Sequence, residues 1–363
     1  MVDSERYTVS IEPLDAGAFP ALWRQLERRA KPHFFLSSCW VTVWLAAYRP
    51  DVQVATIFYD GGVIGLALLT IQRQVRHGVI RSRVLRLGQT GVASEDQIWI
   101  EYNDLLLDPA HADTAPRAFM RYLLGRGDWD EFQLGATLAE RVQHYQGPGC
   151  EPVLKWSAPV YIVDLQAIRE QKKPYRAILS RNTRHQINRS ERLYQARGKL
   201  TFSVITDPDE MLQHWQPLAC LHQQRWGAEP GQSGFANPDF VRFHQLLIRQ
   251  GAGQGMVEFC ILWLDGEPIG LLYNFVYQGR VYFYLSGIQY ESDARCKPGL
   301  LLHALAIQHY LDAGYECYDF MGGAAQYKAS LGVEDGELQL VSFQRPRLAL
   351  RLEQLGRKVK SSI

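Results

Sequence analysis

Residues 53–71 read QVATIFYDGGVIGLALLTI, and residues 258–276 read EFCILWLDGEPIGLLYNFV. Each stretch is a run typical of a β-strand, then Asp-Gly, then a second such run that opens on Ile-Gly-Leu. Asp-Gly tolerates the positive φ angles of tight two-residue turns, so both stretches are predicted to be β-hairpins. The chain therefore contains the same local motif twice.

The repetition continues after the hairpins. Residues 115–136 and 299–324 each predict a helix that ends in glycine and is followed by a short aromatic strand. Two copies of one α/β unit explain this better than a coincidence of hairpins. The length of 363 residues also favours two domains. We expect domains at residues 1–165 and 166–345, followed by a basic tail at residues 346–363.

The composition is that of a soluble globular protein. Hydrophobic residues make up 47% and charged residues 21% of the chain, and a formal net charge of +1 argues against binding DNA by charge alone. The six cysteines are scattered without metal-type spacing, which favours a reducing compartment and no metal. No signal region and no apolar run of about 20 residues are recognisable. We expect a cytoplasmic protein without an integral membrane segment.

The two copies differ before the downstream helix. The second copy reads ARCKPGLLLHAL from residue 294, with Arg295 and Lys297 flanking the start and Pro298 and Gly299 opening the helix. The first copy reads DPAHADTAPRAF from residue 108, without glycine and with an acidic flank. Glycine at a helix start lets backbone amides approach an anion, and the helix dipole attracts phosphate. The second copy is predicted to hold a phosphate, although a tight turn is the alternative.

The order of these motifs resembles a known family. An Asp-Gly hairpin is followed by YLSG at residues 284–287, KPGLLLHALAI at residues 297–307, GYECYDF at residues 314–320 and then Tyr-Lys. This order is similar to the GNAT acyltransferase superfamily, in its BioF2-like or CelD-like branch, which is related to the Fem-type peptidyltransferases. The resemblance is close over residues 165–345, and the first half is similar only to the degenerate amino-terminal copy of double-GNAT proteins.

The resemblance implies transfer of an acyl group from acyl-CoA to an amine by direct attack, with no metal. The donor's pyrophosphate would lie on the loop from Arg295 to Leu301, where the amides of Gly299, Leu300 and Leu301 would contact it. The superfamily's usual loop is richer in glycine, so a different phosphate-bearing donor stays open. The oxyanion donors would come from the strand containing Tyr284 and Ser286.

Two residues on either side of the second copy's glycines are candidates for chemistry. Lys328 matches the lysine that Fem-type enzymes carry after an aromatic residue, here Tyr327, and the resemblance implies that Lys328 stabilises developing negative charge or binds an acidic substrate group. Asp319 closes the preceding strand and is a candidate general base if burial raises its pKa. The alternatives are a lysine that packs its stem on the surface and a carboxylate that holds a turn.

A third group of candidates lies at residues 219–240. His222, Arg225 and Trp226 have helical spacing, so they share one face of a predicted helix. The Gly/Pro/Ser/Asn-rich loop that follows could cover an acceptor pocket. His222 is a rival to Asp319 as general base, and Arg225 and Trp226 are predicted to bind the acceptor with Ser286 and Tyr327. A structural role for a lone helical histidine is the alternative.

Positive charge is concentrated between Lys172 and Lys199, where Glu191 is the single acidic residue. This stretch is either a solvated helix face or a phosphate-binding surface for a nucleotide-linked sugar or a tRNA. The carboxyl-terminal residues 345–363 predict a second basic, amphipathic helix.

We therefore expect an α/β (α+β) chain of two tandem GNAT-like domains, each a mixed, mostly antiparallel sheet flanked by helices, with the first copy degenerate. The predicted activity is N-acyl transfer, with acetyl-CoA or another acyl-CoA as donor. The expected acceptor is an amine such as an amino sugar or another cell-envelope or polysaccharide precursor. A Fem-like transferase that uses aminoacyl-tRNA and a catalytically silent GNAT-fold subunit in polysaccharide biosynthesis are the alternatives.

Overall fold

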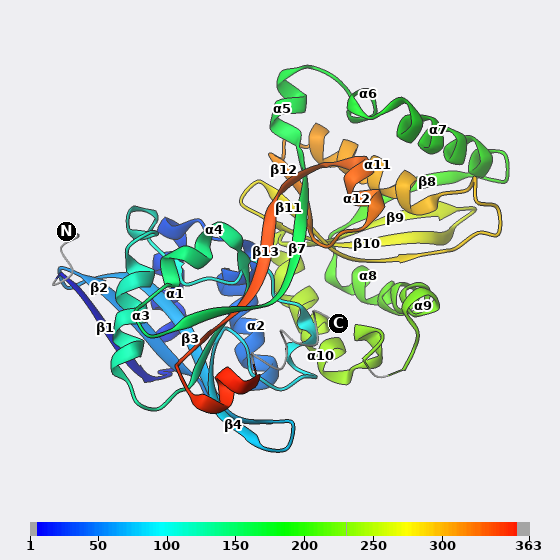
Figure 1. Ribbon diagram of the computed structural model, residues 1–363. Helices are drawn as coiled ribbons and strands as arrows, with labels where there is room; N and C mark the ends of the chain where they lie inside the picture. The colour runs from blue at the N-terminus through cyan, green and yellow to red at the C-terminus, as the bar shows by residue number, and fades with distance from the viewer. Residues whose placement is uncertain (1–5, 230, 354–363) are drawn as a thin grey trace. The chain divides into compact units, whose positions relative to one another are not determined.

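The computed structural model of the chain describes residues 6–229 and 231–353 (Figure 1). It divides into two compact units. Unit 1 comprises Met1–Ala158 and Glu337–Ile363, and unit 2 comprises Pro159–Gly336. The predicted boundaries lie a few residues further along the chain, after residues 165 and 345. Residues 354–363 of the predicted basic tail lie outside the described residues.

Unit 1 contains a mixed sheet and its covering helices. Its elements are β1 (Tyr7–Pro13), α1 (Phe19–Ala30), η1 (Phe34–Leu36), α2 (Ser38–Tyr48), β2 (Gln53–Tyr59), β3 (Gly62–Arg76), β4 (Ile80–Leu87), η2 (Asp96–Ile98), β5 (Leu106–Leu107), η3 (Pro109–His111), α3 (Ala115–Gly125), β6 (Glu131–Leu138), α4 (Ala139–Val142) and η4 (Gln143–Tyr145).

Unit 2 begins inside β7 (Glu151–Asp164) and ends inside β13 (Val333–Gln344). Between them lie α5 (Leu165–Glu170), α6 (Tyr175–Ile178), α7 (Arg181–Gln195), β8 (Leu200–Ile205), α8 (Pro208–Gln213), α9 (Trp215–Trp226), η5 (Gly234–Ala236), α10 (Pro238–Gly251), η6 (Ala252–Gln254), β9 (Val257–Leu264), β10 (Glu267–Tyr277), β11 (Arg280–Ile288), α11 (Pro298–Asp312), β12 (Cys317–Gly322) and α12 (Gln326–Leu331).

Both predicted hairpins are confirmed. β2 pairs with β3, and β9 pairs with β10, each pair antiparallel. At the turns, Asp60 and Gly61 have φ angles of 49° and 78°, and Asp265 and Gly266 have φ angles of 52° and 87°. Two consecutive residues with positive φ are the signature of a type I′ turn, whose twist matches that of the flanking strands.

The repeat inferred from the sequence is present in the topology. The strand order β1-β2-β3-β4-β6 of unit 1 has its counterpart in the order β8-β9-β10-β11-β12 of unit 2. In each unit the last two of these strands are parallel, and the connection between them contains one α-helix, which is α3 in unit 1 and α11 in unit 2. The predicted α/β class with two GNAT-like sheets is therefore confirmed.

Each sheet receives its last strand from the far half of the sequence. In unit 2 the end of β7 pairs antiparallel with β12, from Asp164 opposite Cys317 to Val160 opposite Gly322. In unit 1 the end of β13 pairs antiparallel with β6 over residues 338–344. The chain thus exchanges the final strand between its two copies, which explains why unit 1 consists of two segments.

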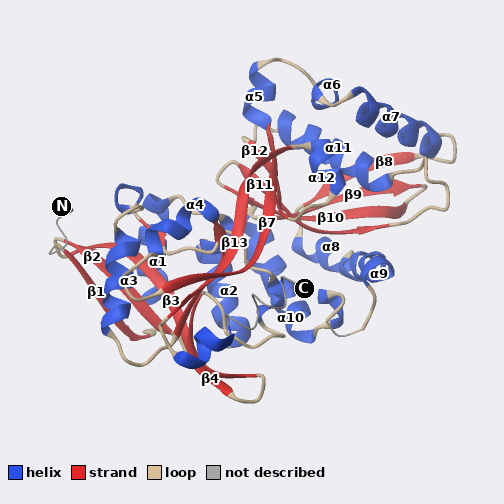
Figure 2. Cartoon of the chain, in the orientation of Figure 1, coloured by secondary structure: helices blue, strands red, loops and turns tan. Residues whose placement is uncertain are grey.

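The sheet of unit 2 is covered on both faces. Figure 2 shows α5, α6, α7 and α11 on one side of β8–β11 and α8, α9 and α10 on the other. The core between α11 and the sheet is apolar and includes Leu272, Phe283, Leu302 and Ile307, all of them buried. Burial of these side chains fixes α11 on the sheet, so the position of the helix start relative to β11 is set by packing.

Candidate functional site

β11 and β12 separate halfway along their length. Their parallel pairing runs from Arg280 opposite Cys317 to Tyr282 opposite Asp319 and then stops. β12 bends where the register against β7 shifts, and Met321 has a φ of 60° there. A non-glycine residue at positive φ is held by its surroundings and is common at functional sites. Beyond Tyr282 the backbone of β11 is no longer paired with β12, and we call this unpaired stretch between the two strands the opening.

The same strand carries a bulge at Tyr284. Tyr273 of β10 pairs with Leu285, but the next residue, Asn274, pairs with Phe283, so Tyr284 has no counterpart across the ladder. A bulge re-aims the side chains around it. The corresponding pair in unit 1, β3 and β4, runs without a shift in register.

The amino terminus of α11 follows β11 after a loop at residues 289–297, as the sequence predicts. Pro298 occupies the first turn, and no side chain caps the helix. The first helical bond runs from the amide of Leu301 to the carbonyl of Lys297, at 3.1 Å, so the amides of Gly299 and Leu300 precede it. Leu301, which was predicted to offer its amide, instead uses it inside the helix, and its side chain is buried in the core.

Gly299 has room around it. A Cβ placed on Gly299 would come no closer than 3.7 Å to any atom, the nearest being Cγ1 of Ile288, and its φ lies outside the left-handed region. Neither backbone strain nor packing therefore requires glycine at this position.

The basic residues around this helix start differ in how far their polar groups are already bonded to other residues. The guanidinium of Arg295 forms an ion pair with Asp293, at 2.8 Å from Nη2 to Oδ2, and this pairing lowers the pKa of Asp293 to about 2. The backbone amide of Lys297 donates to Oγ of Ser190, at 2.8 Å, which joins α7 to the start of α11. Arg189, the neighbour of Ser190, has a buried Nε for which the described residues supply no hydrogen-bond partner.

Lys328 is buried rather than extended into solvent. It lies on α12, with 7% of the residue exposed, and its ammonium donates to the carbonyls of Gly322 at 2.7 Å and Met321 at 3.2 Å. These carbonyls belong to the bend of β12. The ammonium therefore bridges two carbonyls of β12 just beyond the point where its pairing with β11 stops.

Asp319 is fully buried on β12. Its Oδ2 lies 2.9 Å from Nη1 of Arg280, and its Oδ1 accepts from the amide of Met321 at 2.7 Å. Both bonds favour the ionised carboxylate. Asp319 thus connects Arg280, at the start of β11, with the bend of β12 at Met321.

His222 lies on α9 and is mostly buried. Its Nδ1 is 2.9 Å from Oγ of Ser233, a residue of the loop that the sequence predicts to cover the acceptor pocket. Burial, and secondarily the charge of Arg225, lowers the pKa of His222 to about 4. The imidazole is therefore neutral at pH 7 but only weakly basic.

Tyr284 belongs to a hydrogen-bonded group that the sequence did not reveal. Its hydroxyl lies 3.0 Å from Nε2 of His244, and Nδ1 of His244 lies 3.2 Å from the hydroxyl of Tyr273. His244 is fully buried on α10, and burial lowers its pKa well below the usual value. A neutral imidazole with a hydroxyl at each nitrogen fixes the position of both tyrosines. No local motif marks His244, because its partners are 29 and 40 residues away.

Arg225 and Trp226 come together with Tyr290. The guanidinium of Arg225 donates to the hydroxyl of Tyr290 and lies 4.9 Å from the ring centroid of Trp226. The charge of Arg225 also acts on Tyr327, whose pKa is raised mainly by burial. This group, which we call the aromatic cluster, joins the end of α9, the loop after β11 and α12. Tyr290 is a member that the sequence did not single out.

Two further candidates complete the description. Tyr327 stacks on His303 of α11, with ring centroids 5.4 Å apart, and burial followed by the charge of Lys328 lowers the pKa of His303 to about 3. Ser286 is half-buried on β11, two residues beyond the bulge. Its side chain lies on the face of the sheet that α11 covers. Its neighbour across the ladder is Leu272, which belongs to the core between α11 and the sheet.

Within residues 6–229 and 231–353, no group of three or more His, Cys, Asp or Glu side chains is arranged to hold a metal ion. None of the helices in this described part of the chain combines the length and the hydropathy that crossing a membrane requires.

Comparison with known proteins finds a family model that matches most of unit 2. Residues 181–329 match the family model described as acetyltransferase (GNAT) domain, and the resemblance inferred from the sequence is confirmed over these residues. The match covers the helix start of α11, the bulge of β11 and Lys328. No curated protein matches the chain by sequence.

Solved structures match almost the whole chain. FemX is 11% identical, with a TM-score of 0.58, and the match covers 95% of this chain and 99% of FemX. L-PGS from Bacillus licheniformis is 14% identical, with a TM-score of 0.53, covering 95% of this chain and 97% of that one. A conserved protein of unknown function from Bacteroides thetaiotaomicron is 11% identical, with a TM-score of 0.57, covering 93% and 100%. At these identities the matches show a shared fold.

Proposed function

We propose that unit 2, whose residues 181–329 match a GNAT acetyltransferase domain, transfers an acyl group from acyl-CoA to an amine. The observation that carries the proposal is the start of α11. The backbone amides of Gly299 and Leu300 precede the first hydrogen bond of the helix. Neither packing nor backbone strain requires glycine at position 299. Amides in this arrangement, at the positive end of a 15-residue helix, suit a pyrophosphate.

The matching helix in unit 1 supports the assignment to unit 2. At the start of α3 the counterpart of Gly299 is Pro116, which has no amide hydrogen. The counterpart of Leu300 is Arg117, whose amide already donates to the carbonyl of Thr114 at 3.2 Å. The acidic residue Asp113, whose carboxylate lies 3.5 Å from Arg141, also precedes this start. The chemistry for holding a phosphate is thus weaker in the first copy.

Positive charge for the phosphates would come from Lys297 and Arg189. The guanidinium of Arg295 is paired with Asp293. Because this ion pair is exposed and weak in water, a phosphate can readily replace Asp293 as the partner of Arg295. Arg189 has a buried Nε without a partner among the described residues, and a guanidinium pairs well with phosphate oxygens. The bond from Lys297 to Ser190 holds α7 beside the helix start.

The opening between β11 and β12 would receive the thioester arm of the donor. The amine nitrogen then attacks the thioester carbon, the new C–N bond forms, and the C–S bond breaks. The amine loses one proton and the departing thiolate gains one, so the reaction needs a proton path but no oxidant or metal. Holding the two reactants in the opening supplies proximity.

Tyr284 is the best-placed hydroxyl for the developing charge. Tyr273 can donate to Nδ1 of His244, and Nε2–H of His244 can then donate to the oxygen of Tyr284. In this tautomer the oxygen of Tyr284 accepts from His244, and the hydroxyl of Tyr284 would donate to the oxyanion or to the thiolate when the donor is bound. His244 is a positioning residue in this scheme, and Tyr284 is the catalytic residue.

The other residues predicted from the sequence keep a place in the proposal, and some of them have a different role from the predicted one. Lys328 would keep the bend of β12 open and contribute positive charge to the oxyanion. Asp319, held by Arg280, fits an ionised structural carboxylate, and His222, with a pKa of about 4, is a weak base, so we propose that water accepts the amine proton. The aromatic cluster of Arg225, Trp226, Tyr290 and Tyr327, with Ser286, would bind an acceptor that carries an anionic or ring-shaped group, such as a sugar-linked precursor.

Calorimetric titration of the full chain tests the proposal. The titrants are acetyl-CoA, longer acyl-CoAs and aminoacyl-tRNA, and the variants are Gly299→Glu and its matched control Gly299→Ala. We expect saturable acyl-CoA binding that Gly299→Ala changes by less than about threefold, because a Cβ fits, and that Gly299→Glu abolishes by charge repulsion.

The other outcomes overturn the proposal in different ways. Binding of aminoacyl-tRNA alone would establish the Fem-like alternative, for which the basic residues of α7 would be the tRNA contact. Binding of none of the titrants would establish the catalytically silent subunit.

A further inference from the structure

A two-stranded hairpin projects from the sheet of unit 1. β2 pairs with β3 only as far as Leu69, and β6 pairs with β4 only from Val84 onward. Between these limits, residues 71–83 of β3 and β4 pair with each other and with no further strand in the described part of the chain. Figure 1 shows this hairpin beside the label of β4, where it extends beyond the other strands of unit 1. We call residues 71–83 the basic hairpin.

The exposed surface of the basic hairpin combines apolar and basic side chains. Val75 is 56% exposed, and Val79, in the turn, is 78% exposed. Val75 lies opposite Arg81 in the ladder, and Arg73 lies two residues before Val75 on the same face. Both arginines are exposed, and neither has a hydrogen-bond or ion-pair partner among the residues that the structure describes. An apolar tip is thus bordered by two unpaired positive charges.

A short helix near the carboxyl terminus presents the same two kinds of side chain. The chain is helical over residues 348–353, and Leu350 is buried, which fixes the inner face of this helix. Leu348 and Leu352 are four residues apart, so they share the outer face, where they are 81% and 66% exposed. Arg351, beside them, is also exposed.

The acidic side chains near this end of unit 1 do not neutralise the charge. The carboxylate of Glu353 lies 3.0 Å from Nη2 of Arg76, from Oε2, and this ion pair joins the helix to the basic hairpin. Further acidic side chains here are likewise paired with arginines, and they are Asp128, Asp130 and Glu131. The guanidinium groups of Arg73, Arg81 and Arg351 are left over, so this end of unit 1 attracts anions.

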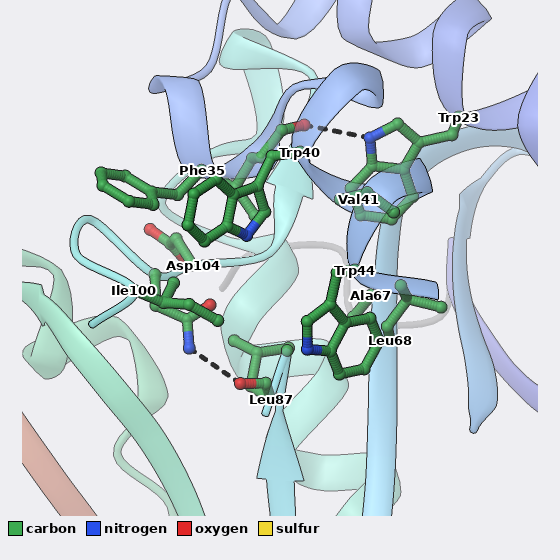
Figure 3. A pocket seen from close by; sticks show the side chains of 13 residues that line it. Trp23, Phe35, Trp40, Val41, Trp44, Ala67, Leu68, Leu87, Ile100 and Asp104 are labelled. Carbon is green, nitrogen blue, oxygen red and sulfur yellow. Dashed lines mark hydrogen bonds between the residues drawn. The ribbon is translucent and has the colours of Figure 1, made fainter. Parts of the chain in front are cut away.

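A cavity inside unit 1 is too small to compete as a binding site for an apolar partner. It lies among Trp23, Trp40 and Trp44 (Figure 3) and has a volume of about 20 Å³, which is room for one water. These three tryptophans are buried. The exposed valines and leucines of the basic hairpin and of the helix, by contrast, can be reached from solvent.

We propose that the basic hairpin and the helix at residues 348–353 dock unit 1 on the surface of an anionic lipid bilayer. The exposed valines and leucines would enter the boundary between the head groups and the acyl chains, and the three unpaired arginines would contact lipid phosphates. A projecting apolar tip enters a bilayer without a matching cavity, which a protein partner would have to supply. A nucleic acid would pair with the arginines but leave the apolar side chains in water. The docking surface lies in unit 1 alone and does not depend on the chemistry of unit 2.

Sedimentation of the full chain with lipid vesicles tests the proposal. The anionic vesicles contain equal parts of phosphatidylglycerol and phosphatidylcholine, and vesicles of phosphatidylcholine alone are the neutral control. We expect saturable binding to the anionic vesicles, at least about tenfold tighter than to the neutral ones and weaker as the salt concentration rises. Absence of binding to the anionic vesicles would overturn the proposal.

Removal of the apolar tip separates insertion from adsorption by charge. The double variant Val75→Ser, Val79→Ser keeps the charge of the hairpin and should bind the anionic vesicles at least about fivefold more weakly than wild type. Val333→Ser is the matched control, because Val333 is 63% exposed but lies in unit 2, and it should bind as wild type does. Equal binding of the double variant and wild type would overturn the proposal, because charge alone would then explain the binding.

Removal of the arginines tests the charge. The double variant Arg73→Gln, Arg81→Gln should bind the anionic vesicles about tenfold more weakly, while its binding to neutral vesicles stays unchanged. Arg24→Gln with Arg28→Gln, at exposed positions of α1, is the matched control and should bind as wild type does. An unchanged melting temperature shows that each variant is folded. Equal losses in the two arginine variants, or binding of duplex RNA without binding of anionic vesicles, would overturn the proposal.

Discussion

The buried carboxylate of Asp319 and the guanidinium of Arg280 form an ion pair at the start of the opening between β11 and β12, with 2.9 Å between Oδ2 and Nη1. Arg280 is the first residue of β11, and Asp319 lies on β12 directly opposite Tyr282. The pair therefore joins the two strands at the last point where they are hydrogen-bonded. Its position predicts that it closes one end of the opening.

Asp319→Asn should lower the free energy of unfolding by about 2–3 kcal/mol, because it leaves the half-buried guanidinium of Arg280 without its partner. The shape of the pH–rate profile should not change, since the carboxylate is a structural group in our account. Chemical denaturation and steady-state kinetics across pH measure the two effects. The double variant Asp319→Asn, Arg280→Met is the control, and it should recover part of the lost stability.

A different result would reassign Asp319. If Asp319→Asn leaves stability unchanged but removes the rise of the rate with pH, then Asp319 is the general base and the ion pair with Arg280 does not hold it ionised during turnover.

Lys328→Met should lower turnover by about 100-fold while changing the affinity for the donor by less than about threefold. The substitution keeps a long apolar stem but removes the charge that binds the carbonyls of Met321 and Gly322 and that we place near the oxyanion. Turnover and donor binding are measured separately, by kinetics and by calorimetry. Unchanged turnover would remove Lys328 from the mechanism.

The same variant has a readout that does not depend on activity. The charge of Lys328 is one reason that the pKa of His303 lies at about 3. Its removal in Lys328→Met should raise that pKa, although burial continues to hold it below its ordinary value. An NMR titration of the imidazole signals against pH measures the change.

Tyr284→Phe should lower turnover by about 10- to 100-fold, because it removes the hydroxyl that we assign to the oxyanion or the thiolate. Tyr273→Phe is the matched control. It removes a hydroxyl from the other nitrogen of the same imidazole, His244, but leaves the hydroxyl of Tyr284 in place, so its effect should be several-fold smaller. Equal effects of the two variants would mean that the hydroxyls act through packing around His244.

Much of the fold was predictable because it depends on local signals that repeat. Asp60-Gly61 and Asp265-Gly266 specify their turns through backbone geometry alone, and the two apolar helices follow from glycine and proline punctuation. The exchange of β7 and β13 between the units was not predictable. Antiparallel pairing of a final strand has the same local pattern whichever sheet receives it, so only the tertiary structure decides its partner.

At the site, the positions of residues that follow from main-chain signals were predictable. The burial and the hydrogen-bond partners of side chains were not. Gly299 lies at the predicted helix start because proline and glycine determine that start. Lys328 was expected at the active site from the resemblance, with a surface position as the alternative, but its burial on the carbonyls of β12 depends on a bend at Met321 that no sequence signal marks. The contact of His244 with Tyr273 and Tyr284 was missed because it joins an interior helix position to two distant strands.

Stability should depend on pH through His222. Its pKa is about 4 in the folded chain and has an ordinary value of 6.5 when exposed, so between these values the unfolded chain binds a proton that the folded chain does not. Stability is therefore complete above pH 6.5 and falls as the pH drops toward 4, by up to about 3 kcal/mol from this residue. His244 and His303 contribute with the same sign, because burial lowers their pKa values too.

Denaturant titrations at several pH values test this dependence. His222→Gln should reduce the loss of stability between pH 6.5 and 4 relative to wild type, once the two are compared at pH 7. An identical pH dependence in the variant would show that His222 is exposed to solvent in the folded protein.

The measurement that tests the central claim most directly follows four backbone amides in a proton–nitrogen NMR titration of the full chain with CoA. The amides of Gly299 and Leu300 should shift saturably, because they precede the first hydrogen bond of α11 and would donate to the pyrophosphate. The amides of Arg117 and Ala118, which already donate to Thr114 at the start of α3, should not move. Unmoved Gly299 and Leu300 signals at saturating CoA, or shifts confined to Arg117 and Ala118, would contradict the account.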